Sequence, residues 1–176
     1  MSKRYALAFF TLTLGLCTPG ATWAAKAQVG DKAPWFKLKS VTGKVVTNKS
    51  MRGFPALLVV GTTRKAAPLC KDWVYKALEV YGRKIYVYQV IVADNPWFIP
   101  DHVVISKIKK MIDKKHLHRV LIEWYTVFAD SYGVARSDLP TVFALNSEGI
   151  ILWRHRGVLT DGALDTLRSK IRLRQE

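Results

Sequence analysis

The sequence predicts an α/β domain in which a mixed central β-sheet carries helices on both faces and is preceded by a β-hairpin extension. Three observations predict this class. Apolar runs of strand length occur at 56–62 and 84–94, and a helical pattern lies between them. A strand, a helix and a strand over this length form a βαβ unit. Further on, NSEG is a tight hairpin signal that joins two more strands.

The first half of the chain justifies these elements in order. Residues 29–47 contain short alternating runs around a glycine, which is typical of a β-hairpin. ALLVVGT at 56–62 is continuously apolar, as expected for a strand that is buried on both faces. Pro68 suits the first turn of a helix, and Gly82 ends the helical pattern. KIYVYQVIVAD at 84–94 is the next strand.

The second half predicts a lysine-bearing helix, short connecting elements, a hairpin and a last helix. In order they are a helix at 103–115, a short strand or extended link at 119–124, a short helix at 125–134, strands at 139–146 and 149–157, and a helix capped by Thr160.

The start of the chain has the pattern of a secretory signal peptide. A positive pair, Lys3 and Arg4, precedes the apolar run YALAFFTLTLGLC, the breakers TPG and several small residues. We therefore expect a signal peptide at 1–24, a folded domain at 27–174 and a periplasmic location. An uncleaved anchor is the alternative.

Cysteine usage follows from that expectation. Cleavage after Ala24 removes Cys17 and leaves Cys70 as the exported protein's one cysteine, so no internal disulfide can form. A single cysteine is unusual in an oxidising compartment, where cysteines normally come in pairs.

The chain is strongly basic, with a formal net charge of +15. The excess gathers mainly at 107–119, 154–156 and 168–174. A basic protein outside the cytoplasm meets anionic lipid or glycan more readily than DNA, so we expect no nucleic-acid partner. Weak contact with an anionic envelope surface is one interpretation of the charge, and a solvated, soluble surface is the other.

Several segments, in the right order, resemble the redoxin branch of the thioredoxin-like superfamily. VGDKAPWFKL at 29–38 resembles the opening of that family, and VTGKVVT with MRGFPALLVVG resembles its hairpin and first core strand. SYGVARSDLPTVFALNSEGIILWRHRGVLT is similar to the segment that carries the family's cis-proline, which would be Pro140. The branch holds alkyl hydroperoxide reductase and thiol-specific antioxidant proteins and exported thiol–disulfide oxidoreductases. The resemblance implies a thioredoxin-like fold.

The resemblance also places a site at the start of the first helix. Active oxidoreductases of this group have two cysteines that flank a dipeptide there, and Ala67, Pro68, Leu69 and Cys70 match that motif with its first cysteine replaced. The missing residue is the nucleophile, whose pKa a helix N-terminus lowers. Peroxidases of the group carry Thr or Ser three residues before their cysteine, where Ala67 again stands. Cys70 matches the resolving cysteine, and its apolar i+4 neighbour Val74 predicts a buried thiol with a raised pKa.

A partner groove is the second candidate site. In related proteins the proline loop lies against the cysteine site and offers its backbone to an extended peptide. Leu139, Pro140 and Thr141, with the aromatic Trp97 and Phe98 of the PWFIP loop, are therefore candidate contacts for a protein or peptide partner. The alternatives are a turn kept for folding and aromatic side chains that cover the edge of the sheet.

The predicted function is that of an exported redoxin-type protein without the first cysteine, acting as a non-catalytic binding or accessory member. One alternative is a single-cysteine thiol–disulfide oxidoreductase or peroxidase-like antioxidant that acts through Cys70. Another is a basic envelope-surface binding protein that uses 107–119. His116 and His118 have no carboxylate cluster beside them, so no metal site is predicted. No phosphate loop or nucleotide fingerprint is present, and we expect no cofactor.

Overall fold

A computed structural model describes residues 26–93 and 99–171 of the chain. The predicted signal peptide at 1–24 and the candidate contacts Trp97 and Phe98 lie outside the described residues. The strands are β1 (Lys37–Ser40), β2 (Val45–Thr47), β3 (Ala56–Gly61), β4 (Tyr86–Val92), β5 (Val120–Glu123), β6 (Thr141–Leu145) and β7 (Ile151–Arg156). The helices are η1 (Asn48–Met51), α1 (Ala66–Tyr81), α2 (Asp101–Met111), η2 (Lys114–Arg119), α3 (Val127–Ser131) and α4 (Asp161–Lys170).

The strands form one mixed sheet in the order β2-β1-β5-β4-β3-β6-β7, which confirms the predicted fold class. β3, β4 and β5 are parallel, and β3 also pairs with β6 in antiparallel register. The predicted N-terminal hairpin is β1 with β2, which joins the sheet through β5. The βαβ unit at β3, α1 and β4 brings the start of α1 to the carboxyl end of β3.

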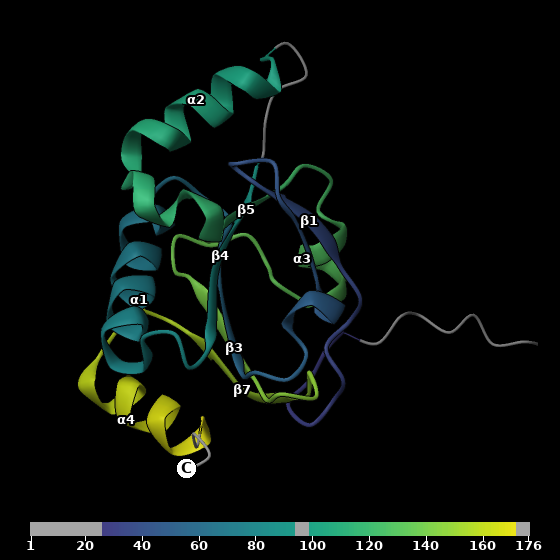
Figure 1. Ribbon diagram of the computed structural model, residues 1–176, viewed down its shortest axis with the longest axis vertical. Coiled ribbons are helices and arrows are strands. Elements are labelled where there is room, and N and C mark those ends of the chain that lie inside the picture. Colours follow the sequence, from purple (N-terminus) through teal and green to yellow (C-terminus); the bar gives the residue numbers. More distant parts are fainter. Residues whose placement is uncertain (1–25, 94–98, 172–176) are drawn as a thin grey trace, which may run out of the picture.

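The two faces of the sheet are covered by different helices. α1 and α4 lie along one face and the short α3 lies along the other (Figure 1). Helical spacing places Cys70, Val74, Ala77, Leu78 and Tyr81 on one face of α1, and the structure buries all of them except Leu78, which is half-buried. They pack with Val59, Val142 and α4 residues in one core cluster, whereas Phe128 and Tyr132 belong to the cluster on the opposite face. Each face of β3 therefore has its own apolar core, which explains why the strand is apolar throughout.

α2 lies at the top of the molecule in Figure 1, at the opposite end from α4. Of its residues only Ile108 is fully buried, within a third cluster that includes Val120 and Ile122 of β5. The predicted helix at 103–115 is thus shorter in the structure, because Ile112 takes an extended conformation (φ −121°, ψ 139°). That bend lets the Ile112 side chain reach the same cluster, and the 3-10 helix η2 follows it.

The predicted cis bond at Pro140 is wrong, because the described residues contain no cis peptide bond. A trans X–Pro bond is the intrinsically favoured form by about 0.5–1 kcal/mol. Hydrogen bonds hold the loop around it: the Pro140 carbonyl accepts from the Gly157 N–H at 3.0 Å, and the Leu139 N–H donates to Ser137 Oγ at 3.0 Å.

Within residues 26–93 and 99–171, no helix has the length and apolar character that crossing a bilayer needs.

Candidate functional site

Three segments meet at the carboxyl end of β3: the start of α1, the loop before β6 and the turn after β7. The Thr62 hydroxyl donates to the Ser137 carbonyl at 3.0 Å and accepts from the Ser137 N–H at 2.8 Å. On the other side, the Trp73 indole N–H donates to the Gly157 carbonyl at 3.0 Å. The segment just before α1 is therefore tied to the start of the Pro140 loop, and α1 itself is tied to the turn after β7.

Cys70 is the candidate thiol, and its side chain has 0% exposure. Burial raises the pKa of the Cys70 thiol to about 12. A methyl group on Gly61 would lie 2.9 Å from Cys70 Sγ, so the sulfur occupies space that only a glycine leaves open. The predicted burial of Cys70 is confirmed. A thiol in this environment stays protonated at neutral pH, and the thiolate is the reactive form.

The other matched positions lie nearer to the surface. Ala67 and Leu69 are half-buried and Pro68 is exposed. The position that matches the missing nucleophile therefore carries a methyl group where solvent can reach it. Pro68 lies in the first turn of α1, which begins at Ala66, slightly earlier than the sequence indicated.

The N-terminus of α1 is capped by threonine rather than by its own N-cap residue. Lys65 makes no side-chain cap, and the Ala66 N–H instead donates to the Thr63 hydroxyl at 3.3 Å. Thr63 Oγ1 also donates to Asp138 Oδ1 at 2.9 Å, and Lys65 Nζ lies 3.5 Å from Asp138 Oδ2. A carboxylate thus stands beside the positive end of the helix dipole. Lys65 is exposed beside Asp138, and the shift in the pKa of Cys70 comes from burial.

The candidate groove residues divide into exposed and buried members. Leu139 is 42% exposed, whereas Pro140 is buried and Thr141 is 3% exposed. Thr141 stands in β6 between Val60 and Arg156. Of these three loop positions, Leu139 is the one that presents its side chain to solvent.

Sequence reasoning missed an aromatic group beside this site. His155 stacks on Trp153 at 5.1 Å and packs against Trp73 at 5.6 Å between ring centroids. A methyl group on Gly157 would lie 2.9 Å from His155 Nε2, which is buried and has no hydrogen-bond partner among the described residues. Trp153 and His155 are two residues apart in the same strand, so their side chains lie on the same face of the sheet. That shared face could have been predicted from the sequence.

Sequence reasoning also missed Glu123, the last residue of β5. Its side chain is 3% exposed, and its carboxylate accepts from the backbone N–H groups of Phe128 and Ala129 at the start of α3. Burial raises the pKa of Glu123, and these two hydrogen bonds offset part of that rise. A lone carboxylate at the end of the apolar run VLIE was the available signal.

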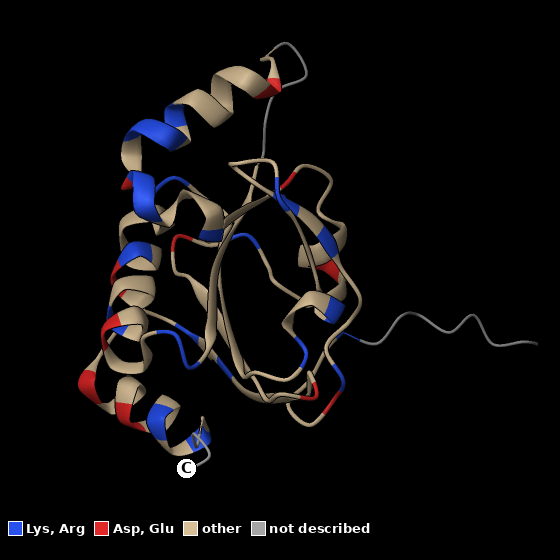
Figure 2. Cartoon of the chain, viewed as in Figure 1, with Lys and Arg blue, Asp and Glu red and all other residues tan. Residues whose placement is uncertain are grey.

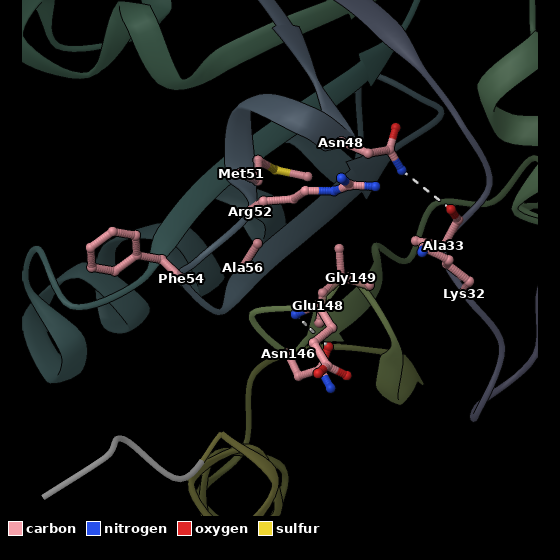
Figure 3. Close-up of a pocket in the computed structure, with 11 residues that line it drawn as sticks. Lys32, Ala33, Asn48, Met51, Arg52, Phe54, Ala56, Asn146, Glu148 and Gly149 are labelled. Carbon is pink, nitrogen blue, oxygen red and sulfur yellow. Dashed lines mark hydrogen bonds between the residues drawn. The ribbon is translucent and has the colours of Figure 1, made fainter.

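Two other places give no sign of a ligand site. His116 packs against the Tyr75 ring at 5.2 Å, and the described residues hold no group of three metal-ligating side chains. A pocket of about 40 Å³ lies away from Cys70, with Met51 and Arg52 on one side and Asn146 and Glu148 on the other (Figure 3). That volume holds no more than a few water molecules.

The sheet order and the placement of α1 at the carboxyl end of β3 define a thioredoxin-like fold. No protein-family model matches the chain, and no curated protein matches it.

Solved structures with this fold match most of the chain. The exposed lipoprotein thioredoxin of Streptococcus pneumoniae matches with a TM-score of 0.63 and 20% identity, over 77% of this chain and 99% of that one. The thioredoxin domain of a thiol-disulfide oxidoreductase from Bacteroides vulgatus matches with a TM-score of 0.61 and 14% identity, over 84% and 100%. A thiol peroxidase from Chromobacterium violaceum matches with a TM-score of 0.58 and 14% identity, over 82% and 88%. At these identities the likeness establishes the fold.

Proposed function

We propose that the chain is an exported thioredoxin-like protein that binds a protein or peptide partner and does not catalyse thiol–disulfide exchange. One observation carries the proposal: the cysteine that matches the family motif, Cys70, has 0% exposure and a pKa raised by burial to about 12. Ala67 stands at the accessible position, and a methyl group cannot attack a disulfide or a peroxide.

Export is supported by two independent observations. The chain begins with a charged pair, an apolar run and small residues, in the order of a secretory signal. One of the similar structures is described as an exposed lipoprotein, which is a property of that protein. Both are consistent with a location outside the cytoplasm, and we propose that this location is the periplasm.

The partner surface that we propose is the apolar group at the carboxyl end of β3. Leu139 and Val158 are each 42% exposed, and their segments are joined by the hydrogen bond from the Gly157 N–H to the Pro140 carbonyl. The half-buried Ala67 and Leu69 belong to the helix start that Thr62 and Thr63 tie to this loop. Apolar side chains around a loop with its own hydrogen bonds suit side-chain contact with a partner.

The rate of thiol labelling tests the proposal against the single-cysteine alternative. With Cys17 replaced by Ser, we expect Cys70 to react with a chromogenic disulfide reagent far more slowly in the native protein than in denaturant, without an inflection near the free-cysteine pKa of about 8.5. Rapid native labelling with a pKa below that value would contradict the proposal and assign the function to Cys70.

Ala67→Cys in the same background is the matched control. Its new thiol lies at the half-buried start of α1, so it should label fast in the native protein and show that the reagent reaches this edge. If the loop still has the shape that redox chemistry needs, this variant should also reduce a disulfide substrate, whereas the parent should not. Disulfide reduction by the parent would overturn the non-catalytic assignment.

A further inference from the structure

The face of α2 and η2 that points away from the sheet carries a ridge of lysines. We define the lysine ridge as Lys107, Lys109, Lys110, Lys114 and Lys115, all of which are exposed. Figure 2 shows several basic residues close together on α2 and the segment after it, whereas on α1 and α4 basic and acidic residues are mixed. The proposed partner site gives this group of lysines no role.

None of the ridge lysines forms an ion pair with a carboxylate in residues 26–93 and 99–171. Lysines elsewhere do have such partners: Lys76 pairs with Glu79 at 2.7 Å, and Lys65 lies 3.5 Å from Asp138. The ridge thus concentrates positive charge of which only the part at Lys115 is offset by a nearby carboxylate, that of Asp113.

Asp113 is the one acidic residue between the ridge lysines, and its side chain is hydrogen-bonded to α1. Its Oδ2 accepts from the Tyr75 hydroxyl of α1 at 2.6 Å. The Tyr75 ring also packs against His116 at 5.2 Å and lies under Lys71 Nζ at 5.1 Å. These contacts hold η2 against α1. The Asp113 carboxylate also interacts with the charge of Lys115, so it offsets part of the positive charge at that end of the ridge.

The apolar face of α2 is already used, which fixes the direction of the ridge. Ile108 is buried in the cluster on β5, with Val104, Ile105 and Ile112 packed against it. The helix cannot rotate its lysines inward without exposing that cluster. Met111 is the exception on the outer side, where it is 66% exposed between ridge lysines.

The geometry points to docking of this ridge on a bilayer surface that contains anionic phospholipid. Lysine is a hydrated point charge without the bidentate fork of arginine, and it is depleted at protein–protein interfaces. The stretch from Lys107 to Lys115 also has no aromatic side chain on which a nucleic-acid base could stack. Clustered lysines on a convex helix suit attraction to anionic headgroups, and an exposed Met111 can enter the interface.

Vesicle sedimentation tests the proposal directly. We expect the protein to bind phosphatidylcholine vesicles that contain about one-third phosphatidylglycerol, and to bind pure phosphatidylcholine much more weakly. Raising the salt from about 0.1 M to about 1 M shortens the Debye length from about 10 Å to about 3 Å and should abolish the difference. Equal binding to both vesicle types would overturn the proposal.

A matched pair of variants assigns the binding to the ridge. Lys109→Gln, Lys110→Gln and Lys114→Gln together should weaken binding to the anionic vesicles by at least about tenfold. Lys32→Gln, Lys49→Gln and Lys84→Gln remove the same charge from exposed positions on other elements and should change it far less. Equal loss in both triple variants would mean that net charge alone drives the binding, and would overturn the site.

Lysine acetylation read by mass spectrometry gives a second, position-resolved measurement on the unaltered chain. On anionic vesicles the ridge lysines should be acetylated several-fold more slowly, while Lys32, Lys49 and Lys84 keep their rates. Shielding of the ridge by duplex DNA and not by vesicles would overturn the lipid assignment in favour of nucleic acid.

Discussion

Cys70 and Glu123 are both buried near the carboxyl end of the parallel strands, but their surroundings give them opposite roles. Cys70 lies on the α1 face among apolar side chains, where the close approach of Gly61 makes room for its sulfur. Glu123 is the last residue of β5, and its carboxylate accepts hydrogen bonds from two backbone N–H groups at the start of α3. Burial raises the pKa of both groups.

The difference shows that burial by itself does not make an ionisable group functional. The neutral thiol of Cys70 loses little when it is buried, because SH is only a weak hydrogen-bond donor. A buried glutamate is costly unless it is hydrogen-bonded, so its two N–H contacts are what keep it in place. We therefore expect Cys70 to act in packing and Glu123 to act in holding α3.

Glu123→Ala should have the largest effect on stability. It removes the acceptor for the Phe128 and Ala129 N–H groups and leaves a small cavity, so we expect a loss of about 3 kcal/mol in the free energy of unfolding. Urea unfolding measures it. Glu148→Ala, at an exposed position, is the control and should change stability by less than about 0.5 kcal/mol. A similar small change for both variants would remove the contrast between Glu123 and Cys70.

Gly61→Ala should have the next largest effect, because its methyl group would lie 2.9 Å from Cys70 Sγ. We expect a loss of about 1–3 kcal/mol from overpacking. Cys70→Ala removes the sulfur, so the double variant should be more stable than the sum of the two single changes by about 1 kcal/mol. Strict additivity in this double-mutant cycle would show that the sulfur is not the atom that requires a glycine.

The smallest effect is a dependence of stability on pH that comes from Glu123. Since burial raises its pKa above the ordinary value of 4.5, its protonated form is favoured by folding. That contribution is present below the ordinary pKa and is lost as the pH rises through the folded-state pKa. Glu123→Gln does not titrate, so the wild type should lose stability relative to this variant as the pH rises from about 4 toward neutrality. A relative gain would mean that the two N–H contacts outweigh burial.

Hydrophobic patterning predicted most of the fold, because the long helices bury a repeating set of side chains and the central strands are apolar throughout. The face of α1 that holds Cys70 and Val74 followed directly from helical spacing, and the uniform apolar run at β3 followed from burial on both faces. Ile112 was assigned to the helix because its spacing fits. Only the position of β5 in space explains why the chain turns there.

The site was less predictable, because its decisive features are single contacts rather than patterns. The isomer at Pro140 depends on the loop around it. That loop is held by hydrogen bonds from the Gly157 N–H to the Pro140 carbonyl and from the Leu139 N–H to Ser137 Oγ, and the sequence does not reveal these partners. Glu123 is a single carboxylate at the end of a strand, and nothing around it in the sequence identifies the N–H groups that donate hydrogen bonds to it. The matched motif, in contrast, could be located because four adjacent residues carry it.

The aromatic group of Trp73, Trp153 and His155 gives the protein an intrinsic fluorescent probe. The Trp73 indole has 0% exposure, donates to the Gly157 carbonyl and lies 6.1 Å from the Trp153 ring. Its emission therefore senses whether α1, β7 and the turn that follows β7 remain together. These segments frame the Pro140 loop, and the chain has six tryptophans. In a variant that keeps Trp73 and Trp153 and carries Phe at the other four positions, a shift in tryptophan fluorescence would report the binding of a partner there without an added label.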